Sequence, residues 1–369
     1  MSNSKPIEYL SADFSNPRDG KATFLTKKIG EFSYESKKGE LELGCANLKY
    51  VYEGFMNQKL DIDLTEGVHQ QIEKWRSESL DKVFRWLVST NSAGTSLREA
   101  LDGCEFVSRR GPLSRIAIAP YIWKSLNDKK QKLACVKYKG VVFIREFNRS
   151  EDGEDDKSDW NPYLNKACYA GRKFEQLLTV EEPDGGPPDT TVPVDPNSEF
   201  NGVFNAGLTV EGRTLNILYA CEFDAMRASD GKFVELKTQL KFIGCGRFFS
   251  FKALCWYFQS HLINIDTLVV GVRDDNFVLN RVDYYSLDDL QSFFKSSGID
   301  TKKCLLFLHH FLSVVKKELD KLPEGSILVT ERPKLSSQFV FTTIEAGDEK
   351  GQAEYAVINE EFREHGWTD

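Results

Sequence analysis

Residues 221–237 read CEFDAMRASDGKFVELK, and this stretch predicts two β-strands joined by a tight turn. The flanking segments, Leu215–Asp224 and Phe233–Lys241, are rich in the apolar, aromatic and β-branched residues that strands favour. Ser229-Asp230-Gly231 between them is typical of a turn. We therefore expect an antiparallel hairpin.

The predicted hairpin brings four charged side chains together. Residues two apart on a strand face the same side of a sheet, and so do residues directly opposite each other on neighbouring strands. With the turn centred on Ser229-Asp230, Asp224 lies opposite Glu235. In the same register Glu222 lies opposite Lys237. Three carboxylates and one ammonium group would then share one patch.

Such a patch has a chemical use. Crowded carboxylates raise one another's pKa, and a divalent cation relieves the repulsion. Two such cations can stabilise the attacking water and the leaving oxygen in phosphodiester cleavage, and a lysine can stabilise the charge of the phosphate. The residues match the Asp…Glu-x-Lys arrangement of (P)D…(D/E)xK nucleases. On this pattern alone, a hairpin whose charges alternate on a solvated face explains the sequence at least as well.

Oxygen ligands are the ones that this sequence offers to a metal. The five histidines include no HExxH motif, and the cysteines at 45, 104, 135, 168, 221, 245, 255 and 304 form no CxxC pair. A zinc site built on thiolates or imidazoles is therefore not expected. Carboxylates favour Mg²⁺ or Mn²⁺, and we expect one or two such ions.

Length and apolar content suit one large domain. The chain has 369 residues, 41% of them hydrophobic, with 26 Phe to fill a core. We expect one domain over residues 1–369, acting as a monomer, with a catalytic core at about 100–285. The start lacks the basic and apolar regions of a signal peptide, and no apolar run is long enough to span a bilayer. We therefore expect a soluble protein of the nucleus and/or cytoplasm with no membrane partner, and scattered reduced thiols fit those compartments.

The net charge of −8 is concentrated in two segments. Residues 151–160 contain six acidic residues and one lysine, and residues 181–199 contain six acidic residues and no basic one. The two segments together carry more negative charge than the net charge of the whole chain, so the remainder of the chain is net basic. A basic groove for nucleic acid is therefore compatible with the composition.

The remaining elements follow from periodicity and turn residues. The second acidic segment is rich in Pro and Gly and is expected to be a mobile loop rather than a domain linker, because candidate catalytic residues lie on both sides of it. The tail after Gly347 is expected to be loosely held. We expect strands at Ala22–Leu25, Glu40–Leu43, Arg115–Ala119, Cys135–Arg145, Ile327–Thr330 and Gln338–Ile344, a hairpin of Thr267–Arg273 and Phe277–Tyr284, and helices at Val68–Leu87 (with Trp75 on its apolar face), Asn161–Leu178, Phe249–Ile263, Ser286–Lys295 and Lys302–Leu319.

Four segments in a fixed order make the chain similar to a known family. They are Phe106–Ile116 (FVSRRGPLSRI), Gly171–Glu175 (GRKFE), Glu222–Asp224 (EFD) and Glu235–Lys237 (ELK), followed by Trp256–Ser260 and Val270–Asp274. In this order and spacing they resemble the DXO family of decapping and 5′-end exoribonucleases, which has a (P)D…(D/E)xK core. The resemblance covers about Phe106 to Asp275 and extends more faintly across the preceding helices.

The resemblance implies roles for the matching residues. As metal ligands, directly or through water, it implies Glu175, Glu222, Asp224 and Glu235, joined by the carbonyl of Leu236. Lys237 and Gln259 would contact the scissile phosphate or the nucleophile, and Arg110 would contact an RNA backbone phosphate. Independently of the family, Lys252 and Gln259 lie seven residues apart, so both can face one side of their helix.

Each implied role has an alternative. Glu175 could be a surface glutamate, Gln259 could bond to the backbone, and Arg110 could form a structural ion pair. Lys173 could form a salt bridge or bind phosphate, and Arg273 with Asp274 is expected to order a strand end. Two positions depart from the family pattern. Arg109 stands where many relatives have an aromatic residue, and Arg172 stands where tyrosine is common, which leaves the preferred RNA end open.

The expected fold is α+β, with a mixed central β-sheet flanked by helices and an additional, mostly antiparallel sheet. The resemblance implies removal of incomplete caps, NAD caps or 5′ triphosphate from RNA, and 5′-to-3′ degradation of 5′-monophosphate RNA, in mRNA 5′-end quality control. Two alternatives stay open. The first is a weakly active or inactive RNA-end binding protein that partners a larger 5′–3′ exoribonuclease. The second is a DNA nuclease of the same superfamily, since discrimination against DNA depends on 2′-hydroxyl contacts.

Overall fold

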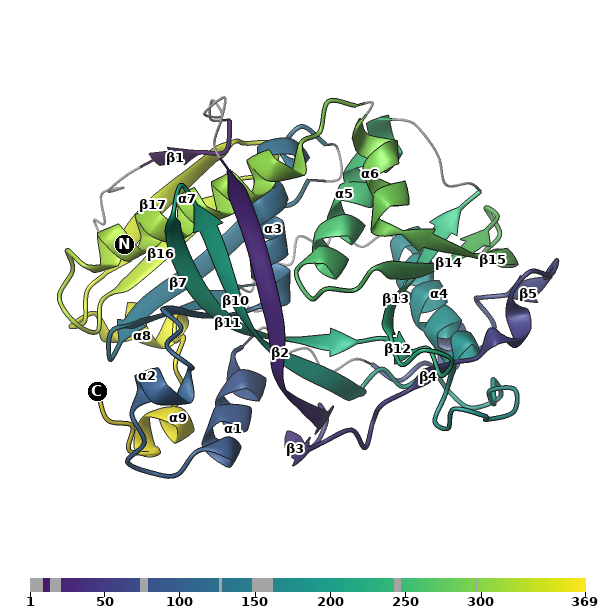
Figure 1. Ribbon diagram of the computed structural model, residues 1–369, viewed down its shortest axis with the longest axis horizontal. Coiled ribbons are helices and arrows are strands. Elements are labelled where there is room, and N and C mark those ends of the chain that lie inside the picture. The colour runs from purple at the N-terminus through teal and green to yellow at the C-terminus, as the bar shows by residue number, and fades with distance from the viewer. Residues whose placement is uncertain are drawn as a thin grey trace.

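Two β-sheets organise the chain (Figure 1). The structure is a computed structural model and describes residues 9–13, 21–73, 79–125, 128–147, 162–241, 247–295 and 297–369. The larger sheet contains β1 (Tyr9–Ser11), β2 (Ala22–Glu35), β3 (Glu40–Leu43), β6 (Phe106–Arg109), β7 (Gln131–Tyr138), β8 (Val141–Glu146), β10 (Ser198–Val210), β11 (Arg213–Phe223), β16 (Ile327–Arg332) and β17 (Gln338–Ile344). The smaller sheet contains β4 (Tyr50–Val51), β5 (Ile62–Asp63), β9 (Thr179–Val180), β12 (Ala225–Met226), β13 (Phe233–Leu240), β14 (Thr267–Arg273) and β15 (Val278–Ser286).

The strand order makes both sheets mixed. The larger sheet is ordered β1-β17-β16-β7-β8-β6-β11-β10-β2-β3, and β6 runs parallel to both of its neighbours. The smaller sheet is ordered β5-β15-β14-β13-β12-β4-β9 and is mostly antiparallel, with β13 parallel to β14 and β12 parallel to β4. Parallel neighbours need a crossover connection, and the helix α5 (Arg247–His261) lies in that connection. The expected fold class is confirmed.

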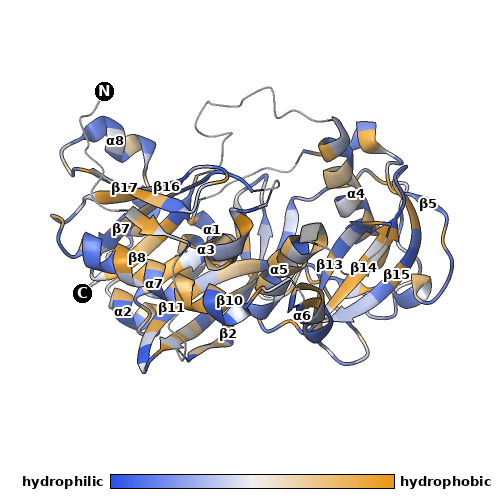
Figure 2. Cartoon of the chain, turned by 90° about the horizontal axis from the view of Figure 1, so that it is seen from above, coloured by the Kyte–Doolittle hydropathy of each residue, from blue (hydrophilic) through white to orange (hydrophobic). Residues whose placement is uncertain are grey.

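Helices cover both faces of the larger sheet (Figure 1). One core lies between the sheet and the helices α3 (Arg110–Ile122), α5, α6 (Leu287–Lys295) and α7 (Thr301–Leu319), and it extends to β14. A second core lies on the opposite face, under α1 (Asp81–Thr90), α2 (Leu97–Ala100) and α9 (Glu360–Glu364). A third lies between α4 (Pro162–Leu178) and the smaller sheet. Figure 2 shows strands such as β8 and β14 largely in the colour of hydrophobic residues, as strands buried on both faces should be.

Tight turns set the hairpins of the larger sheet. Glu211 and Gly212 join β10 to β11 and both have positive φ, +50° and +81°. This is the geometry of a two-residue type I′ turn, whose twist matches that of the paired strands. Lys139 and Gly140 do the same between β7 and β8. Residues 135–145, expected as one strand, are therefore two strands of a hairpin.

The expected strand Arg115–Ala119 is wrong, because these residues belong to α3. Leu113, Ile116, Ala117 and Pro120 are all buried, and their spacing is helical. However, Ile118 and Ala119 on the other side are buried as well. A helix that is apolar nearly all round has no clear amphipathic period, so its short apolar run is easily taken for a strand.

The expected helix over Val68–Leu87 is also wrong. Val68–Gln70 form a single 3-10 turn, η2, and α1 begins only at Asp81. Between them the backbone N–H of Ile72 donates to the carbonyl of Val194, 3.0 Å away, which removes it from any helical ladder. Trp75, placed on the apolar face of that helix, lies outside the described residues.

The C-terminal tail is packed against the larger sheet rather than loosely held. Beyond α8 (Glu349–Glu354), the helix α9 buries Phe362 completely, and Trp367 is 4% exposed. The Phe362 ring stacks on Phe84 of α1 with centroids 4.4 Å apart. It also meets Phe143 of β8 edge-on at 5.7 Å. The tail is therefore part of the second core.

The second acidic segment forms the loop between β9 and β10. It is bonded to α4, because Lys173 Nζ donates to the carbonyl of Thr190 at 2.8 Å and Gln176 Nε2 to that of Val192 at 3.1 Å. Lys173, expected in a salt bridge or on phosphate, is thus buried and holds this loop. The first acidic segment, residues 151–160, lies outside the described residues.

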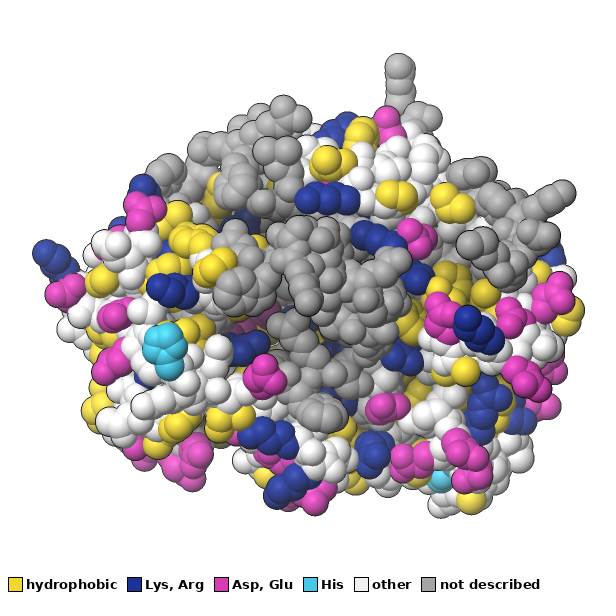
Figure 3. All heavy atoms as spheres, turned by 180° about the vertical axis from the view of Figure 1, so that it is seen from behind, with side chains coloured by type: hydrophobic (Ala, Val, Ile, Leu, Met, Phe, Trp, Pro, Cys, Tyr) yellow, Lys and Arg dark blue, Asp and Glu magenta, His cyan; other side chains and the backbone are white. Residues whose placement is uncertain are grey.

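Charges of both signs share the molecular surface. On the face seen in Figure 3, the described Lys and Arg side chains are interspersed with Asp and Glu, so the net negative charge does not form a single acidic surface there. No helix in the described part of the chain is both long and apolar enough to cross a membrane.

The buried tail predicts that Phe362→Ala lowers the free energy of unfolding by about 3–5 kcal/mol, since it leaves a cavity among aromatic rings. The exposed Glu364→Ala on the same helix should change it by less than about 0.5 kcal/mol. Urea denaturation of both variants measures the difference. Equal stability of the two would show that the tail does not contribute to the core.

Candidate active site at the junction of the two sheets

The predicted hairpin lies where the two sheets meet. β11 ends at Phe223 and β12 begins at Ala225, so Asp224 sits at the junction. β12 pairs with β13 through Ala225 opposite Val234, and continuing this register places Asp224 opposite Glu235, as predicted. The ladder itself is only two residue pairs long, because β11 pairs with β6 and β10 whereas β13 pairs with β14. The predicted pairing of Glu222 with Lys237 therefore does not occur.

A side-chain hydrogen bond continues the connection where the ladder stops. Asp224 Oδ2 accepts a bond of 2.7 Å from the backbone N–H of Leu236. This bond orients the Asp224 carboxylate toward β13, directly beside Glu235. Leu236 itself is 2% exposed and packs in the third core, so its backbone has little freedom to move.

Glu235 carries two ion pairs in an almost closed environment. Its side chain is 2% exposed, with Arg110 Nη1 at 2.9 Å from Oε2 and Lys237 Nζ at 2.6 Å from Oε1. Arg110 Nη1 also donates to the backbone carbonyl of Gln259 at 3.1 Å. A single guanidinium thus links the start of α3, the strand β13 and the helix α5. In this structure Arg110 forms the ion pair that was the alternative to its implied RNA contact.

The two neighbouring carboxylates have opposite pKa shifts. Burial raises the pKa of Asp224 well above its usual range, and the charge of Glu235 raises it further; Lys237 opposes this and Glu175 adds to it. Burial also acts to raise the pKa of Glu235, but Arg110 and Lys237 outweigh it and hold the value at about 2. Burial lowers the pKa of Lys237, yet Glu235 and Asp224 raise it overall. Glu235 is therefore a stable carboxylate, whereas the pKa of Asp224 is shifted in the opposite direction, toward the protonated form.

The other predicted residues surround this pair. Glu175, in the last turns of α4, is exposed, and its charge acts on Asp224. Glu222 is half-buried at the end of β11, and its charge acts on Lys82 of α1. Gln259 is half-buried on α5 and is linked to the junction through its carbonyl. The structure thus gathers Glu175, Asp224, Glu235, Lys237, Arg110 and Gln259 at the junction, with Glu222 on β11, two residues before Asp224.

Two residues near the junction, Lys82 and Gln239, do not belong to any of the sequence motifs. Lys82 is an ion-pair partner of the buried Glu199 on β10, and its ammonium lies 4.8 Å from the Tyr34 ring centroid. Its position on a helix far away in sequence leaves no local signal. Gln239 accepts a bond of 2.7 Å from Lys252 Nζ. Its spacing of two residues from Lys237 does predict the same face of the strand, so this residue could have been found.

Arg273 and Asp274 behave as expected at the end of β14. Asp274 Oδ1 accepts from the backbone N–H groups of Asn276 and Val278, at 2.8 and 2.9 Å, and Arg273 Nη1 donates to the Asp274 carbonyl at 3.0 Å. They close the turn before β15. The prediction that they order a strand end is confirmed.

The donor set at the junction suits a hard divalent cation. Three carboxylates face two cationic side chains, and the raised pKa of Asp224 shows that these cations do not fully compensate its negative charge. Carboxylate oxygens are the ligands that Mg²⁺ and Mn²⁺ prefer. Among the described residues, no three acidic, histidine or cysteine side chains already stand in the arrangement of a metal site. Binding would therefore require these carboxylates to approach one another, with Asp224 in its ionised form.

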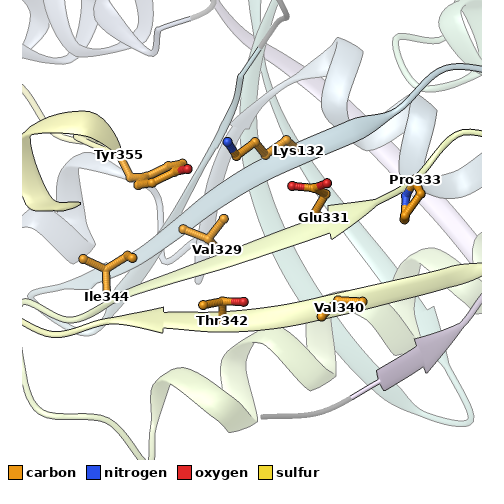
Figure 4. Close-up of a pocket in the computed structure, with 8 residues that line it drawn as sticks. All are labelled: Lys132, Val329, Glu331, Pro333, Val340, Thr342, Ile344 and Tyr355. Carbon is orange, nitrogen blue, oxygen red and sulfur yellow. The ribbon is translucent and has the colours of Figure 1, made fainter. Parts of the chain in front are cut away.

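A separate hollow lies on the far part of the larger sheet (Figure 4). It has a volume of about 360 Å³ and is lined by residues of β7, β16 and β17 and by Tyr355. Lys132 Nζ lies 4.8 Å from the Tyr355 ring centroid, and Glu331 pairs with Lys130 at 3.2 Å. Its lining includes none of the predicted site residues.

Comparisons with known proteins agree on one family. The family model described as RAI1 like PD-(D/E)XK nuclease matches residues 26–363. The chain is 28% identical over 276 residues to "Decapping nuclease dom-3" of Caenorhabditis elegans, an alignment that covers 73% of this chain and 67% of the relative.

Solved structures share the fold. Scheffersomyces stipitis Rai1 in complex with (3′-NADP)⁺ and calcium ion has a TM-score of 0.78 at 19% identity, covering 98% of this chain and 99% of that one. Candida albicans Rai1 in complex with pU5-Mn²⁺ has a TM-score of 0.75 at 16% identity, with the same coverage of 98% and 99%. At these identities the likeness concerns the fold.

The raised pKa of Asp224 predicts that Mn²⁺ binds more tightly as pH rises. Because the ligand must be ionised, the proton competes with the metal, and the apparent affinity should increase as the pH rises from acid to neutral, with release of a proton. Calorimetry in two buffers of different ionisation enthalpy measures that release. Asp224→Asn should bind more weakly and lose the pH dependence. An affinity of the wild type that is constant over this range would contradict the assignment.

Proposed function

The chain belongs to the RAI1-like PD-(D/E)XK nuclease family, and from this premise we propose that it is a metal-dependent nuclease acting on the 5′ end of RNA. One observation carries the proposal: Asp224, at the junction of the two sheets, and Glu235, on β13, meet beside Glu175, Lys237 and Arg110. The names of relatives, which include decapping nucleases and exoribonucleases, support an activity at RNA ends. The pU5-Mn²⁺ complex of the Candida albicans protein supports RNA and a divalent metal as its requirements.

In this proposal Glu175, Glu222, Asp224 and Glu235, with the Leu236 carbonyl, hold one or two Mg²⁺ or Mn²⁺ ions. When bound, such a cation supplies Lewis-acid stabilisation of negative charge on the phosphate. The calcium and manganese ions in structures of relatives support a divalent cation. Glu235 is suited to a permanent ligand because it is ionised at every physiological pH, and Asp224 is suited to a ligand that couples binding to proton loss.

The basic side chains act on the phosphate. Lys237 stays protonated and lies 2.6 Å from Glu235, so it can turn from that carboxylate to a phosphate oxygen over a short distance. Positive charge fixed in a low-dielectric site stabilises the developing negative charge of the transition state without reorganisation. Arg110 bonds to both Glu235 and the Gln259 carbonyl and so ties α5 to β13. It can present its remaining N–H groups to an RNA phosphate. Gln259 would orient the nucleophile or the phosphate from the same helix.

The substrates follow from the family. We propose that the chain removes incomplete caps, NAD caps or a 5′ triphosphate, and degrades 5′-monophosphate RNA in the 5′-to-3′ direction, as part of mRNA 5′-end quality control. The (3′-NADP)⁺ complex of the Scheffersomyces stipitis protein supports a pocket that accepts a dinucleotide. Arg109 and Arg172, both half-buried, add positive charge near the proposed site and are candidates for setting the end preference.

The proposal predicts Mn²⁺- or Mg²⁺-dependent hydrolysis of matched RNAs that carry a monophosphate, triphosphate, unmethylated cap or NAD at the 5′ end, with products identified by mass. Glu235→Gln, which removes the central carboxylate, should lower the rate at least ~100-fold, since changes in the outer shell alone cost 10- to 100-fold. The exposed Glu345→Gln should be as active as the wild type.

Failure of the wild type on every RNA, or full activity of Glu235→Gln, would contradict the proposal. An inactive wild type that still binds RNA ends would instead support a binding protein that partners a larger 5′–3′ exoribonuclease. Equal cleavage of DNA and RNA oligonucleotides would support a DNA nuclease.

A further inference from the structure

A second cationic group lies beside the junction, on α5. Lys252 points toward β13, where its ammonium donates to the carbonyl of Thr238 at 3.2 Å and to Gln239 Oε1 at 2.7 Å. The same ammonium lies 4.8 Å from the Trp256 ring centroid. The side chain is half-buried, so its charged end is held in place and remains in contact with solvent.

The surroundings of Lys252 lack negative charge. Both of its hydrogen-bond acceptors are neutral oxygens, and the part of the chain that the structure describes offers it no carboxylate partner. The charged side chains that act on it most are cations, first Arg273 and then Lys237. Burial, followed by these two cations, lowers the pKa of Lys252 to about 8. Lys237 is paired with Glu235, whereas the two acceptors of Lys252 are neutral. Because charged side chains that are partly buried are normally paired, the place beside Lys252 suits an anion.

The remaining cation is buried next to Lys252. Arg273 is 6% exposed, and its guanidinium lies 4.1 Å from the Phe277 ring centroid. Its Nε has no hydrogen-bond partner among the described residues. Arg273 therefore contributes positive potential, while the more exposed Lys252 is the group that can touch a ligand.

Lys252 also lies at a defined place relative to the carboxylates. Glu235, Lys237 and Gln239 alternate along β13 and face the same side, and Lys252 binds the last of them. At about 3.3 Å per residue, Gln239 is roughly 13 Å along the strand from Glu235. On α5, Lys252 and Gln259 are two turns apart, about 10.5 Å along the helix axis. Along both β13 and α5, the carboxylate site therefore lies toward one end and Lys252 toward the other.

We propose that Lys252, supported by the positive potential of Lys237 and Arg273, binds an internucleotide phosphate of RNA downstream of the scissile one. The proposal rests on RNA being the substrate of the junction, as proposed above, and names the residue that holds the next part of the chain. A phosphate oxygen would take the place of, or share, the hydrogen bond now made to Gln239. Lys252 would then set how many nucleotides the site requires for tight binding.

The rival explanation is that Lys252 only ties α5 to β13. If that were its only role, the effect of changing Lys252 on RNA binding would not depend on any particular phosphate of the RNA. Neutralising one phosphate at a time in the RNA, by methylphosphonate substitution, therefore separates the two explanations without changing the protein. Lys241 provides a matched charge control. It directly follows β13, its side chain is 58% exposed, and it pairs with Asp275 at 2.7 Å.

The test measures binding of 5′-monophosphorylated pentaribonucleotides by fluorescence anisotropy in EDTA, where no turnover occurs. Lys252→Gln should weaken binding about tenfold, since a charge-assisted hydrogen bond is lost. The slope of log K against log salt should decrease in magnitude by about 0.7, as expected for one phosphate contact to single-stranded RNA. Lys252→Arg should bind nearly as well as the wild type, and Lys241→Gln should be unchanged. Thermal unfolding of each variant checks the fold.

The methylphosphonate scan completes the test. In the wild type, neutralising one linkage downstream of the scissile one should weaken binding by a similar factor, and that same substitution should have no further effect on Lys252→Gln. The proposal would be overturned if Lys252→Gln bound RNA as tightly as the wild type, or if the wild type did not bind RNA. It would also be overturned if, at every linkage, the loss from the methylphosphonate added to the loss from Lys252→Gln. Since metal and turnover are absent, a wild type that binds in this way and fails to cleave would contradict the nuclease function alone.

Discussion

The ion pairs of Glu235 are the interaction on which the junction depends. A carboxylate that is 2% exposed is costly unless it is paired and hydrogen-bonded, and here Arg110 and Lys237 provide both. Removing one partner of such a buried pair typically costs about 3–5 kcal/mol, because the other charge is left uncompensated. Arg110 begins α3, Glu235 lies in the smaller sheet and the Gln259 carbonyl belongs to α5. One charged group therefore holds three parts of the fold at the place where the chemistry is proposed.

The same arrangement explains why Asp224 and Glu235 differ although they are neighbours. Arg110 and Lys237 hold the pKa of Glu235 low, whereas burial and the negative charges of Glu235 and Glu175 outweigh Lys237 at Asp224 and raise its pKa. Pairs of titratable groups whose surroundings push their pKa values apart are typical of functional sites. A further cation at the junction would compensate Asp224, and the family to which the chain belongs is one of PD-(D/E)XK nucleases.

Local pattern predicts the parts of this site that are close in sequence. The turn at Ser229-Asp230-Gly231 sets the register of Asp224 opposite Glu235, and the structure has that register. The division of the two strands between two sheets could not be predicted, because it depends on pairing with β6, β10 and β14, which lie far away in the chain. Glu175 was placed by resemblance alone, since an exposed helical glutamate carries no local signal. The helix α3 was missed because it is buried nearly all round, and its first residue, Arg110, proved to be the central link.

The central claim is that a divalent cation binds between the two sheets. An anomalous difference map from crystals soaked in Mn²⁺ tests it most directly. We expect a peak at direct coordination distance from carboxylate oxygens of Asp224 and Glu235, because such oxygens are the ligands that Mn²⁺ favours. A map with no peak at the junction, or with peaks only at surface carboxylates, would contradict it.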